Sequence, residues 1–250
     1  MTAQNPEKEW FGEEHVTPEE KTGKVIGVFD SVASRYDLMN DLMSGGLHRL
    51  WKDRFVRQIR PRAGLRYLDV AGGTGDIAFR IKQKAPNADI TICDLNEHML
   101  EVGRSRAEDK GWLGGFDWVT GNAESRPFPD ASFDVYSIAF GLRNVTHIDT
   151  ALEEVVRVLK PGGRFYCLEF SHVRNPALSK AYDLFSFKAI PRIGKIVAQD
   201  SESYQYLVES IRKFPNQQNL LERMGEAGLK KCLFSNLSAG IVAIHSGIKV

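Results

Sequence analysis

A glycine-rich turn carries the clearest chemical signal in the sequence. The run 68–76, LDVAGGTGD, passes from an apolar strand through three glycines to a residue that can open a helix. Glycines permit positive φ angles and let a ligand lie against bare backbone, while the first amide groups of a helix point toward that ligand. Three glycines in four residues exceed what a strand-to-helix turn needs. The turn therefore predicts a nucleotide ligand that contacts Gly72 and Gly73.

Two carboxylates and a polar cluster narrow the choice of nucleotide. Asp94 ends the next expected strand, nineteen residues after Gly75, the spacing of an acid that binds a ribose hydroxyl pair. Asp69 precedes the glycines, where a carboxylate can face the ammonium and sulfonium groups of S-adenosylmethionine but would repel a pyrophosphate. The cluster 121–124, GNAE, includes Asn122 and can bond an adenine edge. These features favour S-adenosylmethionine.

The pattern along the chain predicts the fold that positions these residues. After Pro61, short apolar runs alternate with helical patterns, which is typical of βαβ units in a parallel sheet with helices on both faces. Two further strand-like segments near the C-terminus are close enough to pair antiparallel. We expect an α/β, Rossmann-like fold with a seven-stranded, mostly parallel sheet and a C-terminal antiparallel hairpin. The expected strands are 66–70, 90–95, 116–121, 133–140, 164–170, 229–237 and 240–248.

The remaining segments are predicted to flank and cover the site. We expect residues 1–23 to form a flexible acidic arm and residues 24–250 to form a single domain. Apolar residues recur at helical spacing over 24–60, with a break at Gly45–Gly46, and predict a helical cover. The segment 171–215 has many aromatic residues and no obvious strand. A connection of this length is typical of a lid, here for the substrate.

Composition and charge exclude several classes of protein. Lys and Arg number 33 against 32 Asp and Glu, which argues against a nucleic-acid partner. The cysteines Cys93, Cys167 and Cys232 are far apart, without metal-ligand spacing, so neither disulfides nor a metal site is predicted. No apolar run spans a bilayer, and the acidic N-terminus has the wrong sign for a secretory or transit peptide. We expect a cytoplasmic protein.

Several stretches resemble one family of enzymes. They are DVAGGTGD, NAESRPFPDASFDV, FGLRNV and RVLKPGGRFYCLEFS, with YDLMNDLMSGGLHRLWK before them and SYQYLVESIRKFPNQ after them. From about residue 20 onward the chain resembles the ubiquinone/menaquinone biosynthesis C-methyltransferases, which are class I S-adenosylmethionine-dependent methyltransferases. The resemblance implies methyl transfer from S-adenosylmethionine to a ring carbon of a lipid quinol. The implied substrates are 2-methoxy-6-polyprenyl-1,4-benzoquinol, demethylmenaquinol or both.

The resemblance also implies roles for individual residues. A serine that the family often contributes from the fourth strand is replaced by Ala139, so that contact is absent or made by backbone. The residues implied to hold or cover the cofactor are Thr74, Asp94, Asn122, Ala123, Tyr36 and Lys52.

Methylation of a quinol carbon needs a group that stabilises the ionised ring hydroxyl, because the carbon is a poor nucleophile until that proton is lost. Arg143 and Asn144 follow the fourth strand, at the edge where α/β sheets bind ligands. Arginine stays protonated near neutral pH, so we assign Arg143 to phenolate stabilisation or activation of a water, and Asn144 to orientation of the ring oxygen. The alternative is a surface arginine beside a helix cap. No metal is required.

Two other functions remain open. The glycines and Ala78 also satisfy the dinucleotide fingerprint, so an NAD(P)-dependent reductase is one alternative. A non-catalytic scaffold subunit of a quinone-biosynthesis complex is the other. A lipid quinol substrate implies peripheral contact with the inner face of the membrane, and the aromatic segment 182–214 is the candidate groove for the prenyl tail.

Overall fold

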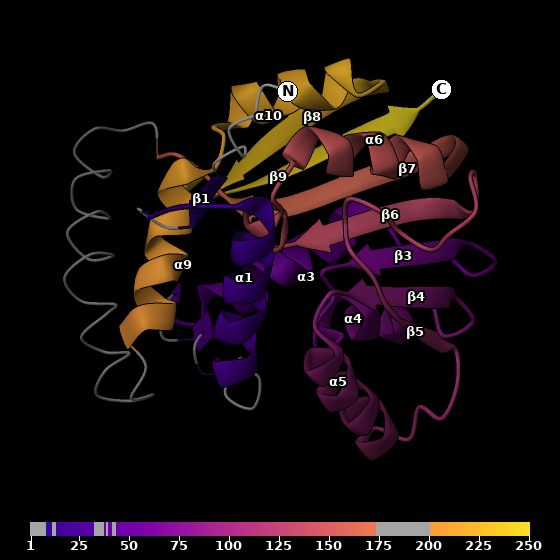
Figure 1. The fold of residues 1–250 in the computed structure, drawn as a ribbon. Helices are drawn as coiled ribbons and strands as arrows, with labels where there is room; N and C mark the ends of the chain where they lie inside the picture. The colour runs from indigo at the N-terminus through magenta and orange to yellow at the C-terminus, as the bar shows by residue number, and fades with distance from the viewer. Residues whose placement is uncertain (1–8, 12–13, 33–37, 39, 42–43, 174–200) are drawn as a thin grey trace, which may run out of the picture.

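A seven-stranded sheet forms the centre of the protein, as the computed structural model shows (Figure 1). The structure describes residues 9–11, 14–32, 38, 40–41, 44–173 and 201–250. The strand order is β5-β4-β3-β6-β7-β9-β8, and β9 runs antiparallel to both of its neighbours. The strands are β3 (Arg66–Val70), β4 (Asp89–Asp94), β5 (Phe116–Thr120), β6 (Phe133–Ala139), β7 (Leu159–Phe170), β8 (Leu229–Leu237) and β9 (Val242–Lys249). The predicted fold class is confirmed, including the antiparallel C-terminal hairpin.

Helices cover both faces of this sheet. Along β7, Phe165 and Cys167 pack against one set of helices, whereas Tyr166 and Leu168 pack on the opposite face. This alternation explains why the parallel strands are apolar almost throughout, since both of their faces are buried. One face carries α3 (Leu47–Ile59), α4 (Asp76–Lys84) and α5 (Glu97–Asp109), and the other carries α6 (Ile148–Val158) and α10 (Gln217–Glu226).

The strand order reverses between β3 and β6, and this position creates room for a ligand. In open α/β sheets, ligands bind at the carboxyl ends of the strands where the order reverses. Both strands are followed by a non-glycine residue in the left-handed region, Ala71 with φ 49° and Phe140 with φ 58°. A Cβ atom on Gly141 would lie 2.3 Å from the Cβ of Ala71. The loop after β6 therefore packs its bare Gly141 backbone closely against Ala71 of the other loop, and such locally strained backbone is typical of ligand sites.

The N-terminal part differs from the prediction of a flexible arm over residues 1–23. Its elements are β1 (Glu9–Phe11), β2 (Glu14–Val16) and α1 (Pro18–Val32), so the helix begins before residue 24. A capping box starts α1, because Thr17 N–H donates to Glu20 Oε2 at 2.9 Å and Glu20 N–H donates to Thr17 Oγ1 at 3.3 Å. The predicted boundary at residue 23 falls inside α1, and the acidic residues Glu19 and Glu20 belong to the first turn of this helix.

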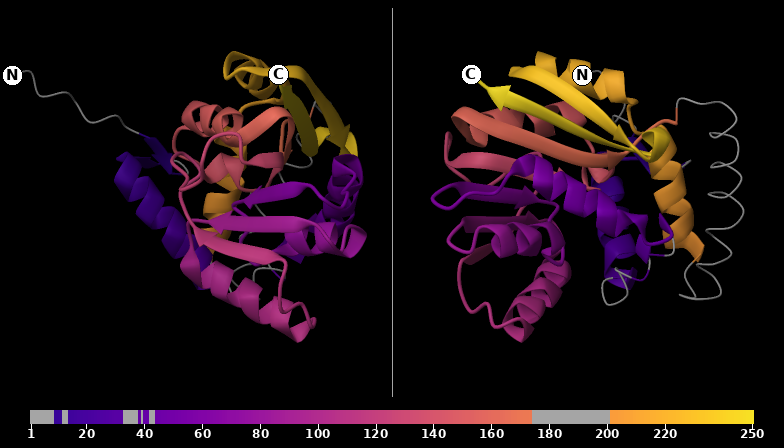
Figure 2. Two further views of the ribbon diagram at one scale, coloured as in Figure 1. Left: turned by 90° about the vertical axis from the view of Figure 1, so that its right-hand side faces the viewer. Right: turned by 180° about the vertical axis from the view of Figure 1, so that it is seen from behind.

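The two described helices nearest the carboxyl edge are α1 and α9 (Ser201–Lys213), which lie side by side there (Figure 1 and Figure 2). The predicted break at Gly45–Gly46 directly precedes α3, which packs on the sheet. Most of the predicted lid falls on residues 174–200, which lie outside the described residues. Within the described ranges, no helix has both the length and the apolar composition that crossing a bilayer needs.

Candidate active site

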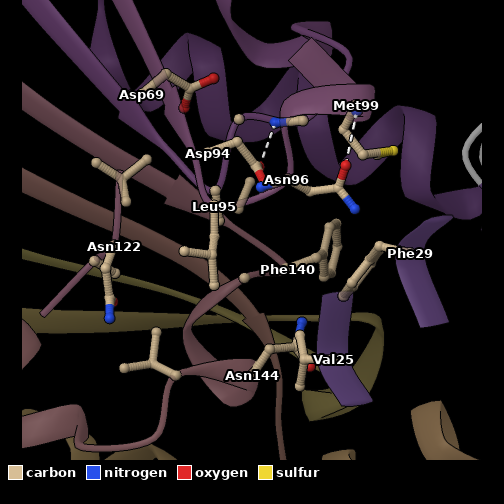
Figure 3. Close-up of a pocket in the computed structure, with 18 of the residues that line it drawn as sticks. Val25, Phe29, Asp69, Asp94, Leu95, Asn96, Met99, Asn122, Phe140 and Asn144 are labelled. Atoms are coloured by element: carbon tan, nitrogen blue, oxygen red, sulfur yellow. Dashed lines mark hydrogen bonds between the residues drawn. The ribbon is translucent and has the colours of Figure 1, made fainter. Parts of the chain in front are cut away.

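A pocket opens at the carboxyl edge above β3 and β6 (Figure 3). It encloses about 1060 Å³, including the solvent at its mouth. The glycine turn and the ends of the neighbouring strands form its walls, and α1 covers it with Val25, Ile26 and Phe29. Nine of the residues predicted from the sequence line it together: Asp69, Gly72, Gly73, Thr74, Asp94, Asn122, Ala123, Lys52 and Asn144. Tyr36 lies outside the described residues.

The glycine turn has no space for side chains. A Cβ atom on Gly72 would lie 2.7 Å from Cγ2 of Ile92 and 3.1 Å from Oδ2 of Asp69. Gly73 has φ 51°, a conformation that residues with a side chain rarely adopt. The backbone of the turn is therefore bare toward the pocket, as the sequence predicts for a bound nucleotide.

Asp94 connects this turn to the start of α5. Its Oδ2 atom accepts a hydrogen bond from Gly73 N–H at 2.7 Å, and its Oδ1 atom accepts one from Asn96 N–H at 2.9 Å. Burial raises the pKa of Asp94, although these backbone hydrogen bonds act in the opposite direction. The carboxylate thus holds the two loops in place while it faces the pocket (Figure 3).

Asp69 is buried beneath the glycine turn with half of its carboxylate unsatisfied. Its Oδ1 atom accepts a hydrogen bond from Ser137 Oγ at 2.7 Å, whereas Oδ2 has no hydrogen-bond partner in the described part of the chain. Burial raises the pKa of Asp69 to about 7; the Ser137 hydrogen bond lowers it, and the carboxylates of Asp76 and Asp94 raise it. A buried carboxylate oxygen at the lining of the pocket fits a cationic ligand.

The buried Asp69 carboxyl should make the stability of the ligand-free protein depend on pH. Its ordinary pKa is 3.8 and its folded pKa is about 7. Between these values the folded chain retains a proton that the unfolded chain has lost, so the free energy of unfolding falls as the pH rises from about 4 to 7. Linkage over this interval gives roughly 4 kcal/mol.

Urea denaturation of wild-type protein and the Asp69→Asn variant between pH 4 and 8 tests this expectation. The wild type should lose stability relative to the variant as the pH rises, because every other titrating group is common to both. Two parallel stability curves would show that Asp69 is already ionised in the folded protein.

Lys52 and Thr74 are bonded to other side chains of the pocket wall. The buried Lys52 ammonium donates to Asp76 Oδ2 at 2.8 Å, and Arg80 Nε donates to Asp76 Oδ1 at 2.8 Å. Burial opposes ionisation of Asp76, but the two cations prevail and lower its pKa to about 2. Thr74 Oγ1 accepts a hydrogen bond from Arg106 at 3.1 Å. Lys52 is therefore the counter-ion of the first residue of α4.

The loop that carries Asn122 is tied to the loop after β6. Asn122 Oδ1 accepts a hydrogen bond from Glu124 N–H at 2.9 Å. The Glu124 carboxylate accepts a hydrogen bond from Thr146 N–H at 3.0 Å and lies 2.6 Å from Nδ1 of His147. Ala139, which stands where the family often has a serine, also lines the pocket. These contacts connect the part of the pocket wall that follows β5 to the part that follows β6.

Arg143 and Asn144 belong to one short 3-10 helix, η2 (Leu142–Asn144), but their side chains reach different places. The Arg143 guanidinium is buried and donates to Glu169 Oε1 at 2.9 Å and to the Phe140 carbonyl, and Arg143 N–H donates to Glu169 Oε2 at 3.3 Å. A surface arginine is therefore ruled out. Asn144 lines the pocket, whereas Arg143 does not.

A second cavity, of about 1030 Å³ including open solvent, lies on the other side of this segment. Val145 and Thr146 line both the pocket and the second cavity, so they form a shared wall. Arg143, Tyr206 and several other basic and aromatic side chains line the second cavity. The two residues predicted to be catalytic thus stand on the two sides of one wall.

Some residues of the site were not expected from the sequence. The sequence predicts a helical cover over residues 24–60 without naming pocket residues in it, and Val25 and Phe29 of α1 line the pocket. Asn96 caps α5 by accepting from Met99 N–H at 3.0 Å, and its amide donates to Asp30 Oδ1 on α1 at 2.8 Å. Its position before a helix predicts the cap but not the bond to α1. Among the described residues, no cluster of three His, Cys, Asp or Glu side chains is arranged to hold a metal ion.

The order of the strands, the antiparallel β9 and the pocket beside the glycine turn define the fold of class I S-adenosylmethionine-dependent methyltransferases. A solved structure of such an enzyme from Thermotoga maritima matches with a TM-score of 0.61 at 22% identity, over 90% of this chain and 99% of its own. Residues 16–249 match the ubiE/COQ5 methyltransferase family. The protein belongs to this family.

Two curated relatives show how similar its members are. The chain is 54% identical, over the whole of both chains, to the ubiquinone/menaquinone biosynthesis C-methyltransferase UbiE of Roseobacter denitrificans. It is 50% identical to the mitochondrial 2-methoxy-6-polyprenyl-1,4-benzoquinol methylase of Bos taurus, over 96% of this chain and 83% of the relative. The resemblance found in the sequence is confirmed, and the protein is an S-adenosylmethionine-dependent methyltransferase rather than a nicotinamide-dependent reductase.

Proposed function

We propose that the protein transfers a methyl group from S-adenosylmethionine to a ring carbon of 2-methoxy-6-polyprenyl-1,4-benzoquinol, of demethylmenaquinol, or of both. Identity of at least 50% to two relatives with these named activities supports the substrate class. The observation that carries the proposal is the shared wall, which has Asn144 at the pocket and Arg143 at the second cavity.

The residues of the pocket fit this cofactor. The bare backbone of Gly72 and Gly73 receives its methionine part, and Asp94 binds its ribose hydroxyls. Asn122 and Ala123 also line the pocket and would contact its adenine. The unpartnered Oδ2 atom of Asp69 matches its positive charge. When bound, the cofactor supplies an electrophilic methyl group on a sulfonium.

The cover of the pocket excludes water from the transfer. Val25, Ile26 and Phe29 of α1 lie over the opening, and the bond between Asn96 and Asp30 fastens this helix to the cofactor loop. Lys52, which also lines the pocket, is held by Asp76, and the family resemblance assigns Tyr36 to the cofactor as well. Positioning two carbon atoms in line within a closed site supplies much of the acceleration of a methyl transfer.

We assign the quinol ring to the region where the second cavity and the pocket meet, between Asn144 on the pocket side and Arg143 on the other side. Arg143 is positively charged there, and its Nε atom is buried without a hydrogen-bond partner in the described part of the chain. A spare charged donor of this kind stabilises the phenolate that forms when the ring hydroxyl loses its proton. Asn144, from its side of the wall, orients the ring oxygen.

A lipid quinol also implies where the protein works. We propose that it contacts the inner face of the membrane peripherally and associates there with other enzymes of quinone biosynthesis. The segment 171–215 then serves as the lid over the prenyl tail, and α9 is its described part.

Mass spectrometry of the reaction products tests the proposed function. Purified protein is mixed with S-adenosylmethionine and a short-chain demethylated benzoquinol or naphthoquinol under reducing conditions. One ring-methylated product and an equal amount of S-adenosylhomocysteine are expected. Whether the benzoquinol or the naphthoquinol is methylated identifies the substrate. Protein that binds S-adenosylhomocysteine but methylates neither quinol, alone or with partner enzymes, would contradict the proposal. Turnover that another subunit supplies would support the scaffold alternative.

A further inference from the structure

Tyr206 reaches the candidate site from a helix distant in the sequence. It lies on α9, is 4% exposed, and donates a hydrogen bond from its hydroxyl to Asn144 Oδ1 at 3.1 Å. Tyr206 lines the second cavity, whereas Asn144 lines the pocket. The hydrogen bond therefore connects a residue that lines the second cavity to a residue that lines the pocket.

The hydrogen bond from Tyr206 determines which atoms of the Asn144 carboxamide remain available to a substrate. An asparagine side chain offers an oxygen that accepts hydrogen bonds and a nitrogen that donates two. The hydrogen bond from the Tyr206 hydroxyl to Oδ1 holds the Asn144 carboxamide in place and leaves its two N–H donors for other partners. These N–H groups are the part of the carboxamide that can stabilise a phenolate, since oxygen lone pairs repel one.

We propose that Tyr206 is a positioning residue for methyl transfer, because its hydroxyl fixes the Asn144 carboxamide so that its N–H groups face the oxygen of the quinol. This inference rests on the proposed function, which places the quinol beside Asn144. Tyr206 acts through Asn144.

The N-terminal hairpin holds Tyr206 in this position. The Phe11 ring stacks on the Tyr206 ring with centroids 4.2 Å apart and planes inclined by 16°. Farther along α9, the Lys213 ammonium lies 3.6 Å from the centre of the Trp10 ring. Both aromatic residues belong to β1, so one short strand contacts α9 at two points. The hairpin of β1 and β2 therefore helps to hold α9, and with it Tyr206, in position at the site.

The surroundings of Tyr206 keep its hydroxyl a donor. Burial raises the pKa of Tyr206 well above its ordinary value; the positive charge of Arg143 lowers it, and Glu169 raises it. A neutral phenol at physiological pH has a proton to give to Asn144 Oδ1. The protonated hydroxyl is therefore able to donate the hydrogen bond that the structure shows between Tyr206 and Asn144.

The Tyr206→Phe variant tests the proposal, because it keeps the ring that stacks on Phe11 and removes only the hydroxyl. We expect kcat to fall roughly tenfold, the size of one hydrogen bond, with the KM for S-adenosylmethionine unchanged. In an Asn144→Ala background the same substitution should cause no further fall. Equal fold-changes in both backgrounds would overturn the proposal.

The matched control is Tyr67→Phe. The Tyr67 hydroxyl also makes hydrogen bonds, with the backbone of Arg62, but Tyr67 lies at the start of β3, the end of the strand away from the pocket. This variant should leave kcat unchanged. A tenfold loss in both variants would show that any missing buried hydroxyl is harmful, and would overturn the specific role of Tyr206.

A second measurement does not depend on turnover. The side-chain amide of Asn144, assigned in ¹⁵N spectra by its loss in Asn144→Ala, should be rigid in wild-type protein and mobile in Tyr206→Phe. Equal order in both proteins would overturn the proposal. If the wild type methylates no quinol, the proposed function fails, while these spectra still decide whether Tyr206 fixes Asn144.

Discussion

Replacing Asp94 by alanine is expected to weaken cofactor binding by about 30- to 900-fold. Two charge-assisted hydrogen bonds to the ribose are lost, which together amount to roughly 2–4 kcal/mol. The structure adds a second cause, because the carboxylate also accepts hydrogen bonds from Gly73 N–H and Asn96 N–H. Titration calorimetry with S-adenosylhomocysteine measures the loss directly.

The control for this variant is Asp89→Ala. Asp89 is the exposed first residue of the same strand, β4, and its carboxylate does not line the pocket. Its replacement should leave the dissociation constant unchanged. If Asp94→Ala also binds with wild-type affinity, Asp94 does not hold the ribose, and the whole orientation of the cofactor in the pocket must be reconsidered.

Replacing Arg143 by alanine should lower turnover by about 100- to 1,000-fold, the usual effect of removing a donor that stabilises developing negative charge. Cofactor affinity should change little, since Arg143 does not line the pocket. The variant should also lose roughly 3–5 kcal/mol of stability, because Glu169 would remain buried without its cation. Steady-state kinetics and thermal unfolding separate the two effects.

The double variant Arg143→Ala/Glu169→Gln tests whether the loss of turnover is only a loss of stability. Burial raises the pKa of Glu169, whereas Arg143 lowers it, so a neutral amide removes the need for a counter-ion. Most of the stability should return in the double variant while turnover stays low. Turnover that recovers together with stability would make Arg143 a structural residue.

The sequence predicts the cofactor side of the site well, because that side follows from local pattern. A strand, a glycine turn and a helix define the floor, and the carboxyl ends of neighbouring parallel strands must meet at one edge. The approach of Asp94 to Gly73 is a consequence of this geometry. The spacing of Thr17 and Glu20 is also the local pattern of a helix N-terminus, and the structure has the capping box there, although the acidic composition of this region is typical of disorder.

The side of the site that we assign to the quinol depends on contacts between residues far apart in the sequence, and no local pattern predicts such contacts. Arg143 follows β6 and Glu169 lies at the end of β7, and their pairing decides which side of the shared wall the guanidinium occupies. Tyr206 meets Asn144 only because α9 is docked against the N-terminal hairpin. The glycines 162 and 163 predict a turn before residue 164. The pairing of β7 with β6 is interrupted there, because Leu159 pairs with Phe133 and Arg164 with Val135, and Gly162 between them has φ 80°.

The place of β9 in the sheet has a consequence for how the chain is made. A ribosome releases residues in order, so β8 emerges earlier than Val242–Lys249, the strand that pairs with it in the sheet. Until then β7 also keeps its outer edge unpaired. Unpaired strand edges attract other chains, and nascent proteins that expose them depend on chaperones. Translation of this protein therefore passes through a stage at which aggregation competes with completion of the fold.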